Sequence, residues 1–291
     1  MIGIVIRTLD ERELIGRCLD TLARQRGGFA LDVLVVDSGS TDGTVEIAQS
    51  YGHRVLNLDP GEFDYSKALN VGIAEVDGEF VVSLSAHAIP VDDEWLEKMI
   101  APFAAADVAG VSSRQVPWPD APWQEVHRLR HQFADSGRSY SRGGGDGVVF
   151  SNAASAIRRA VWREEPFLLP AAEDLEWAKR VIAAGWRIVY ESEAAVYHSH
   201  DESPRAQALR LIDINRVLGT DRSRRRSRAV REGAGILGRD GAKILGLDEP
   251  VRRKVVYLAE LVRMVYYYIA DFSRAGTTAE RRREDSTSTS P

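Results

Sequence analysis

The 291-residue chain contains little of what marks secreted or membrane-spanning proteins. Cys18 is its single cysteine, which excludes a disulfide framework and fits a reducing cytoplasm. No uncharged apolar run approaches the roughly 20 residues of a membrane-spanning helix. Residues 2–6 form an apolar segment with no charged leader before it, so we expect no signal peptide. The formal net charge of -5 gives no overall attraction to nucleic acid or anionic lipid.

Up to about residue 197, short apolar runs alternate with segments of helical periodicity, which predicts an α/β sheet flanked by helices. The expected strands are residues 2–6, 32–36, 54–58, 79–84, 108–112, 147–150 and 187–190. The expected helices are residues 11–25, 44–50, 66–74, 93–104, 123–134 and 173–184. We expect Cys18 to pack in the core from the first of these helices.

The chain changes character after Pro204, where long helical segments at 205–218 and 250–272 replace the alternation. We predict an α/β domain over residues 1–204, a helical region over residues 205–276 and a polar, disordered tail over residues 277–291.

The last helix has an apolar face, which is typical of packing on its own domain. That face consists of Val255, Leu258, Val262, Val265, Tyr266 and Ile269. Dimerisation and attachment to a membrane surface are the alternatives. The expected location is the cytoplasm, with peripheral attachment at the inner face of the membrane left open.

Residues 136–147 are rich in glycine and polar side chains, and they precede the expected strand at 147–150. We interpret this segment as a mobile loop that closes over a site. An ordinary surface connection is the alternative.

An acidic turn follows the second expected strand, over residues 35–44 with the sequence VVDSGSTDGT. Asp37 stands at the carboxyl end of that strand, where open α/β sheets place ligand-binding groups. Residues of these types also satisfy the N–H groups of turns and helix starts. We favour the capping role for Thr41 and Asp42, and ligand binding for Asp37, which is one position too early to cap the helix.

A second acidic motif, Glu173-Asp174, begins the helix expected at residues 173–184. A carboxylate directed at a reacting hydroxyl can act as a general base. The helix dipole also favours an acid in the first turn without any function, and it lowers the pKa. Apolar neighbours such as Trp177 would have to oppose that shift.

Several sequence blocks occur in the order found in the inverting family-two glycosyltransferases with a GT-A fold, and they most resemble the rhamnosyltransferase-like members. The blocks are residues 4–11, the Asp37 turn, residues 63–72 with 78–79, residues 151–159, residues 173–174 and residues 196–200. The resemblance covers about residues 2–200. It implies a nucleotide-sugar-binding sheet flanked by helices, with a C-terminal helical extension. The implied reaction moves one sugar to an acceptor hydroxyl with inversion, in bacterial polysaccharide or glycoconjugate synthesis.

The resemblance also implies which residues hold the nucleotide, namely Thr8, Glu11, Asp37, Lys67, Asn70 and Ser85. Thr8, Glu11 and Asp37 would contact base and ribose, because carboxylates accept strongly from ribose hydroxyls. Lys67 would reach the diphosphate, and a solvated charge on the helix face is an equally weighted alternative. Arg142, in the glycine-rich loop, is a second candidate for the diphosphate.

The implied general base is Asp174, with Glu173 as the next candidate. The implied donor is a dTDP-, UDP- or GDP-linked sugar, with dTDP-rhamnose as the first hypothesis. The implied acceptor is a hydroxyl, with a lipid-linked saccharide as one candidate. A homodimer remains open.

The sequence departs from the family pattern at the metal site. Ser85-Ala86-His87 stands where the family has a metal-binding Asp-x-Asp motif. Serine is a poor ligand for a hard cation such as Mg²⁺, whereas imidazole is acceptable to Mn²⁺. We predict an altered site in which His87 acts with His198 or His200. A metal-independent enzyme is the alternative.

Two other classes of function compete with sugar transfer. The basic run from Arg222 to Arg228 has the charge that neutralises nucleic-acid phosphates, but the rest of the chain is acidic and contains no base-reading module. A sugar-1-phosphate nucleotidyltransferase would share the α/β sheet. It would also need a glycine-rich basic phosphate loop near the N-terminus, and residues 2–11 contain none.

Overall fold

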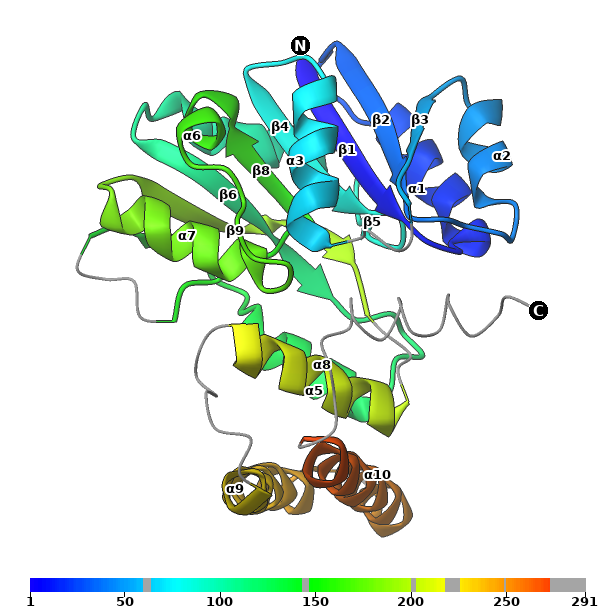
Figure 1. Ribbon diagram of the computed structural model, residues 1–291, viewed down its shortest axis with the longest axis vertical. Helices are drawn as coiled ribbons and strands as arrows, with labels where there is room; N and C mark the ends of the chain where they lie inside the picture. The colour runs from blue at the N-terminus through cyan, green and yellow to red at the C-terminus, as the bar shows by residue number, and fades with distance from the viewer. Residues whose placement is uncertain (60–63, 143–146, 200–202, 218–225, 249, 273–291) are drawn as a thin grey trace. The chain divides into compact units, whose positions relative to one another are not determined.

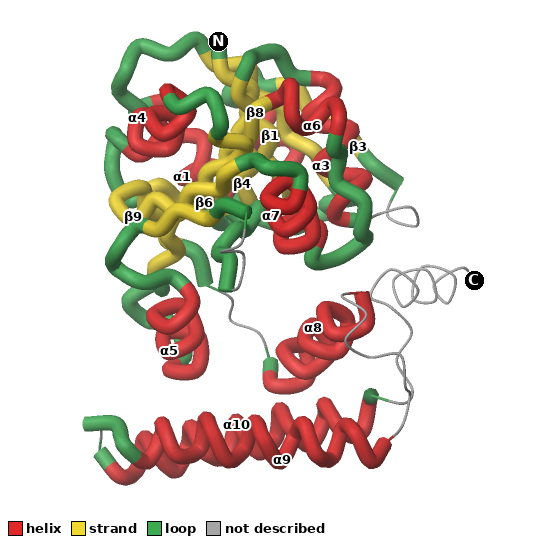
Figure 2. Tube along the Cα trace, turned by 90° about the vertical axis from the view of Figure 1, so that its left-hand side faces the viewer, coloured by secondary structure: helices red, strands yellow, loops and turns green. Residues whose placement is uncertain are grey.

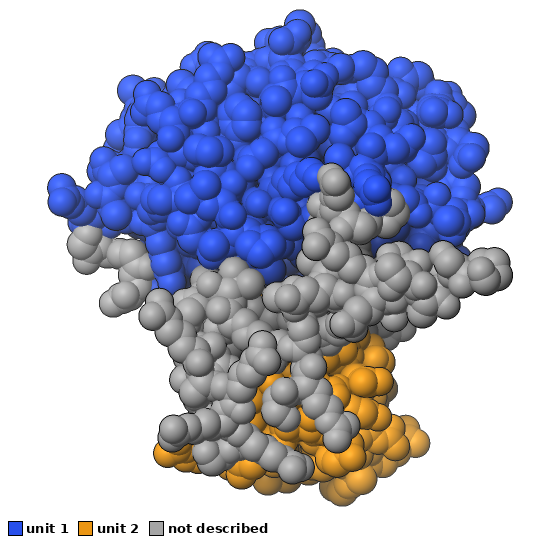
Figure 3. Space-filling model, in the orientation of Figure 1, with its two compact units in different colours: residues 1–121, 125–199 blue, residues 122–124, 200–291 orange. Residues whose placement is uncertain are grey.

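The computed structural model describes residues 1–59, 64–142, 147–199, 203–217, 226–248 and 250–272. The chain forms two compact units, shown in different colours in Figure 3. Unit 1 comprises residues 1–121 and 125–199, and unit 2 comprises residues 122–124 and 200–291. Unit 1 is an α/β domain and unit 2 is helical (Figure 1).

The described residues of unit 1 form a nine-stranded sheet. The strand order is β3-β2-β1-β4-β8-β6-β9-β5, with β7 paired to β9. The strands are β1 (Ile2–Thr8), β2 (Leu31–Asp37), β3 (Arg54–Asn57), β4 (Phe80–Ser85), β5 (Ile89–Pro90), β6 (Val108–Val116), β7 (Arg138–Tyr140), β8 (Ala154–Arg158) and β9 (Arg187–Tyr197).

The strand directions decide which residues meet. β3, β2, β1 and β4 are parallel, β8 is antiparallel to both β4 and β6, and β9 is parallel to β6. The carboxyl ends of β1, β2, β4, β6 and β9 therefore share one edge of the sheet with the amino end of β8. Ligand sites of open α/β sheets form at this edge.

The prediction of a strand at residues 147–150 is wrong. Val148, Val149 and Phe150 are buried but follow an irregular path, and the strand forms at β8 instead. An apolar run signals burial, and burial does not require a strand. The short strands β5 and β7, each of two or three residues, had no signal in the sequence.

Helices cover both faces of the sheet (Figure 2). On one face lie α1 (Arg12–Ala23), α2 (Thr44–Ser50) and α4 (Trp95–Ile100), which continues into the 3₁₀ helix η2 (Ala101–Ala104). On the other face lie α3 (Tyr65–Glu75), α6 (Arg159–Glu164) and α7 (Glu173–Ala183), with α5 (Trp123–Gln132) packed into the same core. The six helices expected in this part of the chain are present, and Cys18 is fully buried as predicted.

Alternating strand residues feed the two cores, because successive side chains point to opposite faces. Ile4 and Ile6 pack with α1, whereas Val5 packs with α3. α3 approaches β1 closely at Gly72, where an added Cβ would lie 2.5 Å from a methyl group of Val5. Glycine is therefore required there for steric reasons.

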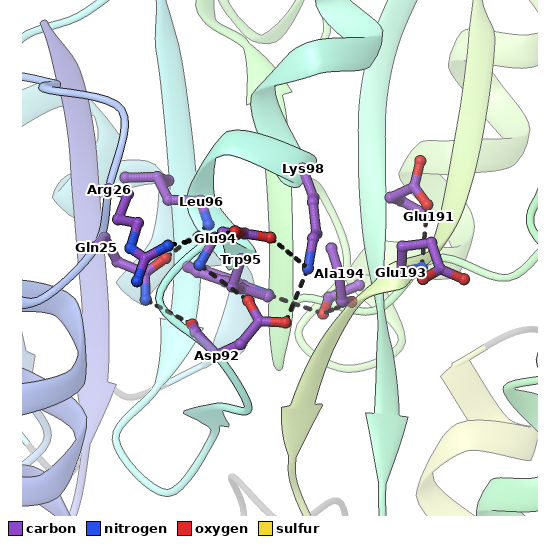
Figure 4. Close-up of polar contacts among 11 residues, drawn as sticks. Gln25, Arg26, Asp92, Glu94, Trp95, Leu96, Lys98, Glu191, Glu193 and Ala194 are labelled. Carbon is purple, nitrogen blue, oxygen red and sulfur yellow. Dashed lines mark hydrogen bonds and ion pairs between the residues drawn. The ribbon is translucent and has the colours of Figure 1, made fainter.

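Polar contacts fix the corner that follows residue 90 (Figure 4). The Gln25 side chain, at the end of α1, accepts from the backbone N–H of Leu96 at 2.8 Å. The Trp95 indole N–H donates to Ser113 Oγ at 3.1 Å, and Ser113 Oγ donates to the carbonyl of Ala194 at 2.6 Å. These bonds tie α1 and α4 to β6 and β9, so they anchor the segment that leaves β4.

Unit 2 contains α8 (Pro204–Val217), α9 (Arg226–Leu245) and α10 (Val251–Asp271). Ala208, Ile212, Ala229, Tyr268 and Phe272 form one buried cluster, and Ile236, Ile244, Leu261 and Val265 form another. The helices predicted at 205–218 and 250–272 are present, and α9 was not predicted. The tail expected at 277–291 lies outside the described residues. None of the described helices is long and apolar enough to cross a membrane.

Candidate functional site

The topology brings the predicted site residues of unit 1 to one edge of the sheet. Thr8, Asp37 and Ser85 are the last residues of β1, β2 and β4. Asn152 lies two residues before β8, and His198 follows the last residue of β9. Residues separated by almost 200 positions in the sequence therefore share one surface.

The loops after β1 and β2 are bonded to each other. Asp10 Oδ1 accepts from the backbone N–H of Thr41 at 2.8 Å, and the N–H of Glu11 donates to Thr44 Oγ1 at 2.8 Å. Asp10 holds this position with a positive φ of 52°, which is uncommon for a residue other than glycine and is a recurrent feature of functional sites. The pairing orients Glu11 on a rigid turn.

Asp37 is buried and has hydrogen-bond partners in its own turn, which its predicted role in ligand binding did not include. Its Oδ2 accepts from the backbone N–H groups of Gly39 and Ser40, each at 2.9 Å, and its Oδ1 accepts from Ser40 Oγ at 2.5 Å. These bonds to the carboxylate fix the conformation of the turn at the edge of the site. Asp42 Oδ1 accepts from the backbone N–H of Thr44 at 3.0 Å. Asp42 therefore has the role at the start of the helix that was predicted for it.

Thr8 is the nucleotide candidate with an unused polar atom. Its side chain is buried, and its hydroxyl has no hydrogen-bond partner among the described residues. Buried polar atoms are nearly always paired, so this hydroxyl is a group that a ligand would satisfy. Lys67 is half-buried in the first turn of α3, and its backbone N–H donates to Asp64 Oδ1 at 2.6 Å.

The Asn70 amide is occupied by the protein. Its Oδ1 accepts from the Trp162 indole at 2.8 Å and from the backbone N–H of Phe167 at 3.2 Å, while its Nδ2 donates to the Phe167 carbonyl at 2.8 Å. These bonds hold the segment that leads to α7. We therefore assign Asn70 to the support of the site rather than to the nucleotide.

Two of the metal candidates, His87 and His198, lie in a chain of four side chains. Glu11 Oε1 lies 2.5 Å from His87 Nδ1, His87 Nε2 lies 3.1 Å from His198 Nε2, and His198 Nδ1 lies 2.9 Å from Gln115 Oε1. Both Nδ1 atoms therefore face oxygen atoms that can accept a hydrogen bond. Both Nε2 atoms face each other, and His198 is buried.

This arrangement has the form of a metal site. Histidines that bind metals usually donate their second ring N–H to a carboxylate or carbonyl. Two nitrogens bound to one ion at about 2.1 Å, at tetrahedral or octahedral angles, lie about 3.0 to 3.4 Å apart. The 3.1 Å between the two Nε2 atoms falls in that range, and it equally suits a direct N–H···N hydrogen bond between the two rings. The two histidines thus fit a divalent cation whose other ligands come from elsewhere.

No group of three or more histidine, cysteine, aspartate or glutamate residues suited to a metal occurs among the described residues. Of the two candidates near residue 200, His198 faces His87, and His200 lies outside the described residues. Glu11 was predicted to contact the nucleotide, but in the structure it contacts His87. Ser85 is half-buried, two residues before His87.

The acidic pair at the start of α7 faces Asn152. Glu173 is 4% exposed, and its Oε1 accepts from Asn152 Nδ2 at 3.2 Å. Asp174 is only partly covered, and its Oδ2 accepts from the backbone N–H of Asn152 at 3.3 Å. The residue before the pair, Ala172, has a positive φ of 53°, so the backbone is strained where the acids enter the site.

Burial makes both acids stronger bases than usual. Burial, and then the charge of Asp174, raise the pKa of Glu173 to about 7, against the opposing effect of Arg7. Burial also raises the pKa of Asp174, opposed by the backbone N–H groups of Leu175 and Asn152. Desolvation therefore outweighs the effects that lower the pKa of each acid, which is the condition for a base at this helix start.

Arg7 and Asn152 are site residues to which no role was assigned from the sequence. Arg7 Nη2 donates to the carbonyl of Asn152 at 2.9 Å, Nη1 lies 3.9 Å from Glu173 Oε1, and the guanidinium lies 5.4 Å from the centre of the Tyr65 ring. Its Nε is buried with no partner among the described residues. A single arginine at the end of the apolar strand β1 was the available signal, because an arginine in such a place is rarely covered unless it is paired.

Two other predicted features are not tested by this site. Arg142 belongs to a glycine-rich segment whose residues 143–146 lie outside the described residues, so a lid remains a prediction. The basic run from Arg222 to Arg228 lies mostly outside them too.

The sequence of this chain is similar to those of known proteins. Residues 3–165, more than half of the chain, match the family described as Glycosyl transferase family 2. The O-antigen chain rhamnosyltransferase WbaN of Salmonella anatum is 33% identical over 190 residues, which cover 62% of this chain and 60% of WbaN. The O-antigen chain rhamnosyltransferase RfbN of Salmonella typhimurium is 29% identical over 222 residues, which cover 73% of this chain and 70% of RfbN.

Solved structures with the same fold share little sequence identity. The mannosyltransferase PcManGT from Pyrobaculum calidifontis, in complex with GDP-Man and Mn²⁺, has a TM-score of 0.56 at 18% identity, covering 99% of this chain and 79% of that one. Glucosyl-3-phosphoglycerate synthase from Mycobacterium tuberculosis, in complex with Mn²⁺, UDP and its product, has a TM-score of 0.55 at 19% identity, covering 75% and 78%.

The raised pKa of Glu173 predicts a pH-dependent stability. Between the ordinary pKa of 4.5 and the folded value of about 7, the folded state keeps a proton that the unfolded chain releases. The free energy of unfolding should therefore fall as pH rises through this window, by at most about 3 kcal/mol. Urea unfolding at pH 5 and pH 8 measures the fall, which should be smaller in Glu173→Gln. Glu193→Gln, at an exposed position, is the control. An equal pH dependence in all three proteins would contradict the assignment.

Proposed function

The chain belongs to glycosyl transferase family 2 and has the GT-A fold that its sequence predicted, and on this premise we propose that it moves one sugar from a nucleotide sugar to a hydroxyl of a growing glycan, with inversion. The observation that carries the proposal is the pair of acids, Glu173 and Asp174, at the same sheet edge as the Thr8 and Asp37 turns and the His87–His198 pair. An inverting transfer needs a base on the acceptor side and positive charge on the diphosphate side, and these residues would supply both, the positive charge through a bound cation and Lys67.

Asp174 is the proposed general base. It is the less covered of the two acids, so an acceptor hydroxyl can approach it, and its raised pKa improves its ability to take a proton. Glu173, buried behind it, bonds Asn152 and lies near Arg7. We assign Glu173 and Arg7 to positioning, since they bond the side chain and the carbonyl of Asn152, the residue whose backbone N–H donates to Asp174.

The nucleotide is proposed to lie over the turns after β1 and β2. Thr8 offers a buried hydroxyl without a partner, and the Asp37 turn offers a rigid backbone next to it. Lys67, in the first turn of α3, is the proposed cation for the diphosphate. We propose that these residues contact the nucleotide, which is the same in all donors that carry the same base.

His87 and His198 are proposed to hold a divalent cation through their Nε2 atoms. Glu11 and Gln115 accept from the two Nδ1–H groups and thereby direct both Nε2 atoms to the same point. A cation bound there would neutralise the negative charge that develops on the departing diphosphate. The donor set, two neutral nitrogens with oxygens supplied by the nucleotide, suits Mn²⁺ better than Mg²⁺.

The donor and the acceptor are proposed from the relatives. Two rhamnosyltransferases of O-antigen chains are 33% and 29% identical to this chain, so we propose a deoxysugar nucleotide such as dTDP-rhamnose as donor and a saccharide as acceptor. A lipid-linked saccharide is the form we expect for that acceptor. The same comparisons give no support to a nucleic-acid-binding protein or a nucleotidyltransferase.

A panel of nucleotide sugars tests the proposed function. A ligand that binds only the folded state raises its melting temperature. With Mn²⁺ present, dTDP-rhamnose should raise it more than UDP-glucose or GDP-mannose, and transfer to a saccharide acceptor should follow. Transfer from a UDP-hexose and none from dTDP-rhamnose would reject the donor but keep the reaction. Failure of every nucleotide sugar to bind would reject both.

Asp174→Asn should abolish most sugar transfer without loss of donor binding. Removal of a general base costs about 10²- to 10⁴-fold in rate. The rate constant for transfer and the donor-induced shift in melting temperature are measured side by side. Glu176→Gln is the matched control, because Glu176 lies in the same helical turn and pairs with Arg180 instead. Normal turnover of Asp174→Asn would move the base to Glu173.

His87→Ala should remove Mn²⁺ binding in the presence of the nucleoside diphosphate. Calorimetry with Mn²⁺ and dTDP measures this, and His53→Ala controls for the loss of a histidine elsewhere in unit 1. Binding should weaken as the pH falls, because a ligating imidazole must be unprotonated. Full activity in excess chelator, unaffected by His87→Ala, would show that side-chain cations neutralise the diphosphate instead.

A further inference from the structure

Helix α10 in unit 2 is apolar on two sides. On one side Leu261, Val265 and Tyr268 are buried against the other helices of the unit. The other side exposes the α10 stripe, which we define as Val251, Val255, Val262 and Tyr266. Their exposed fractions lie between 54% and 76%. The spacing of 4, 7 and 4 residues places them on one face of the helix.

The exposed face of α10 has positive charge and no carboxylate. Arg252 and Arg263 are exposed and border the stripe along one side. At 3.6 residues per turn, the two acids of the helix, Glu260 and Asp271, fall on the opposite side from the stripe, and Asp271 pairs with Arg205. An exposed apolar stripe with arginines at its border is compatible with a helix that lies in a membrane interface, where apolar side chains enter the acyl boundary and basic side chains reach the headgroups.

Positive charge is also concentrated in the C-terminal part of the whole chain. Residues 200–291 contain 19 basic and 13 acidic residues, a net charge of +6, whereas residues 1–199 contain 19 basic and 30 acidic residues, a net charge of -11. The overall value of -5 hides this difference. A basic helical region attached to an acidic domain points to a negatively charged partner for the helices alone.

We propose that the α10 stripe, with Arg252 and Arg263, docks on an anionic lipid surface. The helix lies parallel to that surface, the valines and Tyr266 enter the boundary between headgroups and acyl chains, and the two arginines contact lipid phosphates. The helix does not cross the bilayer, in agreement with its lack of a spanning apolar segment. The protein is thereby held where lipid-linked molecules are found.

A second copy of the chain fits the stripe less well. An antiparallel pair centred on the stripe would set Arg263 of one copy near Lys254 of the other, and a parallel pair would set Arg252 and Arg263 against themselves. No carboxylate on this face compensates that repulsion. A stripe of four side chains is also far smaller than the roughly 800 Å² per partner of a standard stable interface.

Vesicle cosedimentation of the full-length protein tests the proposal. Vesicles containing phosphatidylglycerol should bind the protein at least about tenfold more tightly than vesicles of phosphatidylcholine alone, and 0.5 M NaCl should weaken this binding. The apolar variant Val255→Ser/Val262→Ser/Tyr266→Ser should lose most binding to both. The charge variant Arg252→Gln/Arg263→Gln should lose the preference for phosphatidylglycerol. Val91→Ser, an exposed valine of unit 1, should bind like the native chain.

Circular dichroism of each variant shows whether the helices persist, and the charge variant keeps the test decisive if the apolar variant unfolds. Equal binding of native chain and both variants, equal binding to the two kinds of vesicle, or no binding at all would overturn the proposal. A concentration-dependent dimer that the apolar variant abolishes, without vesicle binding, would assign the stripe to a second copy. The assay contains no nucleotide sugar, so its outcome is independent of sugar transfer.

Discussion

The site depends on the reversal of β8 between β4 and β6. Because β8 runs antiparallel to both neighbours, its amino end joins the carboxyl ends of the other strands, and Asn152 is held at that edge. Asn152 then bonds three charged groups: its carbonyl accepts from Arg7, its side chain donates to Glu173, and its backbone N–H donates to Asp174. A parallel strand in this place would carry Asn152 to the far edge and leave the acids of α7 without this partner.

The titratable side chains at this edge form two groups, for which we propose opposite roles in the reaction. Glu173 and Asp174 share one cation, Arg7, and burial raises the pKa of both acids, which suits the removal of a proton. His87 and His198 are oriented from outside by Glu11 and Gln115, which suits the binding of positive charge at the opposite end of the reaction. In the proposed cation site, His87 and His198 would take the place of the Asp-x-Asp acids that the family resemblance implies, and the neighbouring oxygens of Glu11 and Gln115 leave the two Nε2 atoms to face each other.

Much of the sheet was accessible from the sequence, because buried strands and amphipathic helices leave periodic patterns. The strands at Ile2–Thr8 and Leu31–Asp37 and the helix beginning at Glu173 were predicted close to their observed bounds. Residues 147–150 were misassigned, since a short apolar run has the same appearance in a strand and in a buried irregular segment. Helix α9 was missed because glycines and arginines interrupt its apolar periodicity, and its packing on α10 compensates for that weakness.

The sequence by itself determined the fold class, the family and the residue types of the site, because these follow from local patterns in a given order. Only the tertiary structure decided how those residues are used. In the folded chain the Asp37 carboxylate bonds to its own turn, and the Asn70 amide bonds to Trp162 and Phe167. His87 lies against His198, which is 111 positions away in the sequence. It also brought Arg7 to Glu173. Side-chain partners of this kind depend on strand order and register, which connect distant segments, and no local pattern records which segments will meet.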